Sequence, residues 1–100
     1  MNNKITRHDL LLAYACGHRD FSNMDLSKLN LSFLNLNNAD LSYSNLTGAN
    51  LRNANLEYAD LEDANLEYAD LIYVDLTGAY LAGANLGNAD FMLIYLMQFK

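Results

Sequence analysis

The residue types most suited to covalent chemistry lie at the start of the chain. Cys16 stands between His8 and His18, and a thiol beside an imidazole is the nucleophile–base pair of covalent catalysis. The sequence supplies no third group that would orient the histidine and no recognisable oxyanion site. We therefore expect a buried cysteine beside surface histidines, in a chain that is not an enzyme.

Aspartate and asparagine form the second group, because carboxylates can pair for acid–base work or bind calcium. They recur in a strict register, one position before a leucine or phenylalanine in fourteen of sixteen repeats. Side chains of this type hydrogen-bond the backbone of turns, whereas calcium-binding repeats need a glycine-rich nonapeptide pattern. There is no phosphate-binding glycine loop, and a single cysteine cannot build a thiolate metal cluster. We expect no cofactor and no metal.

The elements that hold these residues follow from a period of five. Every fifth residue from Phe21 to Leu96 is leucine or phenylalanine. A helix would spread this period around its whole surface, and a continuous strand would alternate it between two faces. The period indicates an all-β solenoid in which the chain turns once per repeat and each central residue points to a shared axis. The core is predicted to include Phe21, Leu31, Leu41, Leu51, Leu61, Leu71, Leu81 and Phe91.

The other positions of the repeat suit tight corners. The residue two before the central leucine is alanine in nine repeats, which fits inside a corner. Glycine two positions after it, as at Gly48, Gly78 and Gly83, would tolerate a positive φ.

Residues 1–18 differ from the rest and are predicted to form an N-terminal helical cap, with the repeats over residues 19–100. Thr6 resembles an N-cap, an apolar stripe follows it, and Gly17 stands where a helix would stop. These signals predict a helix over about residues 7–16 that covers the first coil.

The consensus A-(D/N)-L-x-x, seen at 49–51 and 59–61, resembles the pentapeptide-repeat family over roughly residues 19–96. The lead-in over residues 14–21 is similar to that of many bacterial, notably cyanobacterial, members. The resemblance implies a right-handed quadrilateral β-helix with four repeats per coil, and hence about four coils. The number four comes from the resemblance and not from the period.

The net charge of −6 argues against direct binding of nucleic acid. No apolar run approaches the length of a membrane span, so we expect no membrane association and a cytoplasmic location. Some family members bind gyrase by imitating DNA, which makes modulation of a type II topoisomerase the alternative function. The acids expected to form a belt around one or two coils are Glu57, Asp60, Glu62, Asp63, Glu67, Asp70 and Asp75.

The favoured function is a protein–protein interaction scaffold whose partner is unknown. If four repeats make a coil, one side concentrates the aromatic, aliphatic and arginine residues that interface cores favour. The alternative is that these rings stack on one another between coils. The candidate partner face is Phe33, Arg52, Ile72 and Tyr73.

The C-terminal sequence is apolar even at outward positions, which predicts a homodimer joined through the C-terminal coils. Its candidate interface is Met92, Leu93, Tyr95, Met97 and Phe99.

Overall fold

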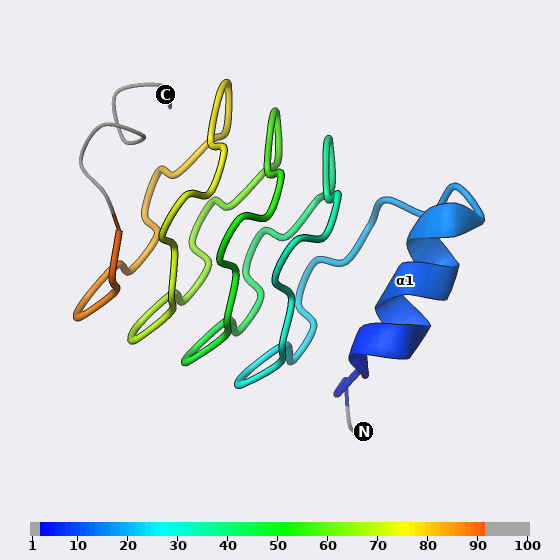
Figure 1. Cartoon of the computed structure of the whole chain (residues 1–100), viewed down its shortest axis with the longest axis horizontal. Helices are drawn as coiled ribbons and strands as arrows, with labels where there is room; N and C mark the ends of the chain where they lie inside the picture. Colours follow the sequence, from blue (N-terminus) through cyan, green and yellow to red (C-terminus); the bar gives the residue numbers. More distant parts are fainter. Residues whose placement is uncertain (1–2, 92–100) are drawn as a thin grey trace.

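The computed structural model describes residues 3–91 and consists of one helix, α1 (Arg7–Ala15), followed by a stack of coils. Figure 1 shows α1 lying across one end of this stack. Successive coils are joined by isolated parallel bridges between residues twenty positions apart, as in Asp20↔Asp40 and Asp40↔Asp60. One coil therefore takes four repeats. Within residues 3–91 the sides are built from these single bridges and not from extended strands.

Each repeat turns its corner in the same way. In the repeat centred on Leu36, the Ala39 amide donates to the Leu36 carbonyl at 3.0 Å, and Asn38 between them has a φ of 63°. This is the pattern of a type II turn, which needs a positive φ at its third residue. All fourteen residues at this position from 23 to 88, which we call corner residues, have a positive φ. The sequence had suggested that conformation only for the glycines.

The residue before each central leucine also stabilises the turn, because its side chain accepts a hydrogen bond from the backbone amide two positions later. The Asp40 Oδ1 atom accepts the Ser42 amide at 3.0 Å, and Asn55 Oδ1 accepts the Glu57 amide at 2.9 Å. The predicted role of these residues as turn formers is confirmed.

The central residues line the axis. Leu31, Leu41, Leu51 and Leu61 are fully buried, and Phe21 and Leu71 are nearly so. Burying one such side chain contributes about 2 kcal/mol before the entropy cost.

Burial falls in the last described coil. Leu81 is only half-buried, and Phe91 is 38% exposed. The predicted core position of Phe91 is therefore not confirmed at this last described residue, whereas Leu81 is partly covered.

Helix α1 begins and ends close to where the sequence predicted. The Thr6 hydroxyl accepts the Asp9 amide at 3.1 Å, and the chain leaves the helix through Gly17 with a φ of 92°. Leu10 is fully buried against the core, while Leu11 and Leu12 are exposed. Of the predicted stripe of Leu10, Leu11, Tyr14 and Ala15, only Leu10 is completely buried, and Tyr14 is partly buried against the core.

The segment around α1 satisfies the open edge of the first coil. In each later coil, backbone carbonyls that point toward the preceding coil accept hydrogen bonds from its amides. Leu26 N, for example, donates to Asn45 O. In the first coil the corresponding acceptors receive groups from residues 4–14 instead. The donor–acceptor pairs are Ile5 N to Asp25 O, Lys4 Nζ to Ser27 O, Arg7 Nη1 to Asn30 O and Ser32 O, and Tyr14 Oη to Asn37 O. An edge occupied in this way offers fewer free groups for pairing with another chain.

Candidate interaction surfaces

One side of the stack carries the predicted partner face. The bridges Asn30↔Asn50 and Asn50↔Asp70 place the repeats centred on Leu31, Leu51 and Leu71 on the same side. We call this the aromatic side. Its outward residues include all four predicted ones: Phe33 in the first coil, Arg52 in the second, and Ile72 and Tyr73 in the third.

These four side chains differ in exposure and in their partners. The Phe33 ring is 74% exposed, Tyr73 is 47% exposed, and Ile72 is half-buried. Arg52 Nε donates to Asp70 Oδ2 at 3.0 Å, an ion pair that the sequence analysis missed. In the sequence, the pair is indicated only by a base and an acid that stand eighteen positions apart, close to the length of one coil. This pair ties the Arg52 side chain in the second coil to the Asp70 carboxylate in the third.

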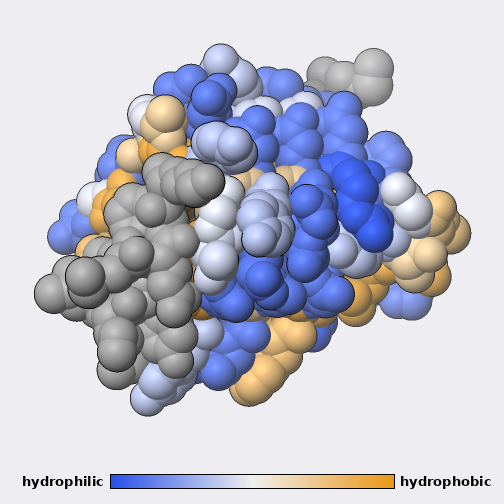
Figure 2. Space-filling model, turned by 90° about the horizontal axis from the view of Figure 1, so that it is seen from above, coloured by the Kyte–Doolittle hydropathy of each residue, from blue (hydrophilic) through white to orange (hydrophobic). Residues whose placement is uncertain are grey.

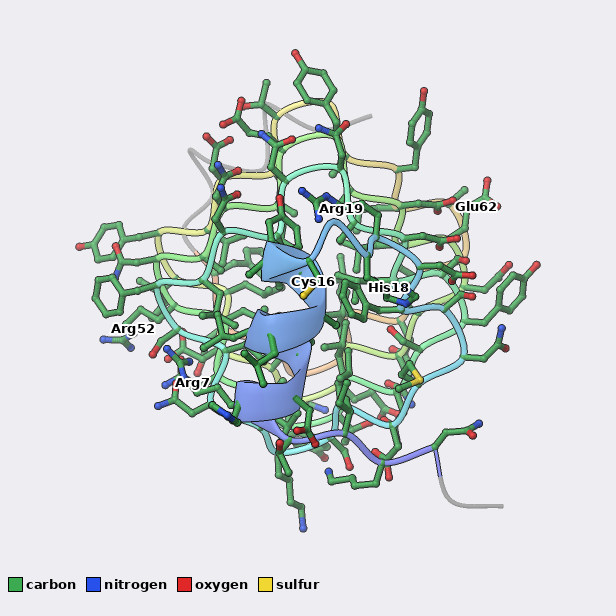
Figure 3. All side chains as sticks on the ribbon, turned by 90° about the vertical axis from the view of Figure 1, so that its right-hand side faces the viewer. Arg7, Cys16, His18, Arg19, Arg52 and Glu62 are labelled. Atoms are coloured by element: carbon green, nitrogen blue, oxygen red, sulfur yellow. The ribbon has the colours of Figure 1, made fainter. Side chains whose placement is uncertain are left out.

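A second side, centred on Phe21, Leu41 and Leu61, is strongly acidic. The bridges align Asp20, Asp40 and Asp60 in one row along the stack, about 4.8 Å apart. The two further acids on this side are Glu62 and Asp63, and no lysine or arginine occurs at residues 20–23, 40–43, 60–63 or 80–83. In Figure 3, which looks along the stack from α1, Glu62 lies on the flank opposite Arg52.

The sequence had predicted that seven acids from Glu57 to Asp75 form a belt around one or two coils, whereas a stripe would run along the stack. The row of Asp20, Asp40 and Asp60 is such a stripe. In the sequence it is indicated by aspartates spaced twenty positions apart, which is the length of one coil. Like charges directly opposite on neighbouring strands destabilise a fold. This row is therefore a feature that turn formation alone does not require, since asparagine serves equally well at other repeats.

Tyr43 borders the acidic side. The negative charge of Asp63, together with the hydrogen bond between the two side chains, raises the pKa of the Tyr43 phenol above its usual value of 10.0. In the next coil the Asp63 carboxylate lies against Gly83, where a Cβ would meet Asp63 Oδ1. Tyr43, Asp63 and Gly83 thus form one continuous corner row.

The candidate nucleophile and base are not arranged as expected. Cys16 at the end of α1 is exposed, so the prediction of a buried cysteine is wrong; it occupies the helix C-cap and not the core-facing side. The His18 ring packs edge-on against Phe21, with ring centroids 5.1 Å apart. Within residues 3–91 there is no ligand-sized pocket and no cluster of three potential metal ligands.

The face of the molecule seen in Figure 2 is mostly hydrophilic. Figure 2 shows hydrophobic residues at the end that carries α1, where Leu11 and Leu12 are 39% and 53% exposed. Over the described part of the chain, no helix has the length and apolar character needed to cross a membrane. The predicted dimer interface, Met92, Leu93, Tyr95, Met97 and Phe99, lies outside the described residues.

Comparison with known proteins gives one family and several solved structures. The model for pentapeptide repeats (8 copies) matches residues 20–42, 44–81 and 59–94. Rfr23, a pentapeptide repeat protein from the cyanobacterium Cyanothece 51142, is 40% identical with a TM-score of 0.47, over 73% of this chain and 50% of that one. The pentapeptide repeat protein alr5209 from Nostoc Pcc 7120 is 32% identical with a TM-score of 0.44, over the full length of both.

HetL, from the cyanobacterium Nostoc sp. strain PCC 7120, is a pentapeptide repeat protein involved in the regulation of heterocyst differentiation. It is 33% identical with a TM-score of 0.44, over 70% of this chain and 39% of that one. The chain thus spans half the length of Rfr23 and the whole length of alr5209. No curated protein matches the sequence.

Proposed function

The chain belongs to the pentapeptide-repeat family, and on that premise we propose that it is a non-catalytic scaffold that binds a protein partner. The binding surface is the aromatic side, with Phe33, Arg52, Ile72 and Tyr73 as its contact residues.

The observation that carries this proposal is the exposure of the Phe33 ring, which at 74% exceeds the 47–65% of the tyrosines at other corners. The φ of 63° at Phe33 is in the left-handed region, which costs an L-residue about 1–2 kcal/mol. Its ring is 74% exposed, so burial within the protein returns little of that cost. Asn53, one coil further along, shows that asparagine fits the same corner. A binding role gives a reason for an exposed ring here, because aromatic and arginine side chains dominate the energetics of interfaces.

Affinity capture with matched variants tests the proposal. The test protein carries Phe33→Asn, Arg52→Ser and Tyr73→Asn, and the control carries Tyr58→Asn, Tyr68→Asn and Lys28→Asn on other sides. Both sets use residues native to the same repeat positions, so both proteins should fold. We expect the control to retain the partner and the test protein to lose it. Retention by both proteins would exclude the aromatic side.

A DNA mimic acting on a type II topoisomerase is the second candidate. The observation in its favour is the row of Asp20, Asp40 and Asp60, whose carboxylates run along the stack, with no lysine or arginine at residues 20–23, 40–43, 60–63 or 80–83. A gyrase supercoiling assay separates the two functions. A mimic inhibits or protects gyrase at low stoichiometry, and substitution of the row by asparagine removes the effect. A scaffold of the first kind does neither.

We further propose a cytoplasmic bacterial protein with a right-handed coil that forms a homodimer through its C-terminal coils. The apolar residues at Met92, Leu93, Tyr95, Met97 and Phe99 support the dimer. Sedimentation at micromolar concentration should give twice the monomer mass, and Leu93→Asp with Met97→Asp should halve it. A monomeric parent protein, or a dimer that survives both changes, would refute this interface.

A further inference from the structure

We draw no further inference here: the strongest candidate, the outward face of α1 at the N-terminal end of the stack, where Leu11 and Leu12 are exposed, is an apolar helix face, and nothing in the described part of the chain shows what covers it.

Discussion

The guanidinium carbon of Arg19 lies 3.5 Å from the centroid of the Tyr14 ring. Arg19 occupies a repeat position that holds buried alanine in the following coils, at Ala39, Ala59 and Ala79. Its side chain therefore turns from the axis toward α1, where Tyr14 in turn donates its hydroxyl to the Asn37 carbonyl at 2.8 Å. These two contacts fasten α1 to the first coil.

Arg19→Ala should lower the free energy of unfolding by about 0.5–2 kcal/mol, the range of a cation–aromatic contact. Alanine fits this repeat position elsewhere, so the loss should come from the contact with α1. Tyr14→Phe keeps the ring and removes only the hydrogen bond, for about 1 kcal/mol. Urea denaturation measures both. An Arg19→Ala protein as stable as the parent would show that the contact contributes nothing.

The more completely a central leucine is buried, the more its replacement by alanine should lower the free energy of unfolding. Leu61 is fully buried, whereas Leu86 in the last described coil is half-buried. Leu61→Ala should cost about 2–5 kcal/mol, and Leu86→Ala clearly less, since the cavity left at a half-buried position can be filled or hydrated. Thermal or urea unfolding of the two proteins compares the same change at the same repeat position. Equal losses would mean that the last coil is packed as tightly as the middle.

Gly78 and Gly48 share a conformation but not a neighbour. Their φ angles are 70° and 67°, so alanine costs a similar backbone strain of about 1–2 kcal/mol at both. A Cβ at Gly78 would meet the Tyr58 ring at 2.5 Å, and one at Gly48 would meet Lys28 Cγ at 3.4 Å.

Gly78→Ala should therefore destabilise the protein more than Gly48→Ala. Tyr58→Asn should remove the difference in the double variant. Persistence of the difference without the Tyr58 ring would point to another cause.

Acid should weaken the first coil through Asp20 and Asp25. Hydrogen bonds from the Ser22 hydroxyl and amide lower the pKa of Asp20 below its usual 3.8, and those from Ser27 do the same for the pKa of Asp25. A carboxyl whose pKa is lower in the folded state contributes its full stability above pH 3.8. It loses that contribution as the pH falls through the folded-state value.

The variant Asp25→Asn removes the ionisable carboxyl group but keeps a side-chain oxygen that can accept the hydrogen bond of the turn. Asparagine makes the same turn bond in the next coil, where Asn45 Oδ1 accepts the Thr47 amide at 3.1 Å. In the variant, the free energy of unfolding should decrease less as the pH falls below 3.8, while the turn is kept. Unfolding curves between pH 5 and pH 2 measure this, and an unchanged pH dependence would contradict the assignment.

The sequence predicted the coil well because its strongest signal is regular. The five-residue period placed residues such as Leu41 and Leu61 at the axis, and Thr6 and Gly17 marked the ends of α1 within a residue. The conformation of the corners was missed, because Phe33 and Tyr58 are residues that sequence rules place outside the left-handed region. Here the turn bond and the ladder impose a positive φ on whatever residue occupies the corner.

The surfaces were less predictable, because they depend on residues one or two coils apart. Arg52 and Asp70 meet across eighteen positions, and Asp20, Asp40 and Asp60 align across twenty. Neither relation has a local pattern. Each depends on the coil length, which the family resemblance supplied and the period did not, and on side-chain positions that the spacing alone does not give.

The affinity of the captured partner for the aromatic-side variant tests the central claim most directly. Calorimetry would compare the parent protein, the variant Phe33→Asn, Arg52→Ser and Tyr73→Asn, and the matched control Tyr58→Asn, Tyr68→Asn and Lys28→Asn. If the aromatic side is the binding surface, its variant should bind at least about thirtyfold more weakly, since each central aromatic or arginine contact contributes on the order of 1–2 kcal/mol. The control should bind like the parent. Equal affinity of all three proteins, or a larger loss in the control, would contradict the account.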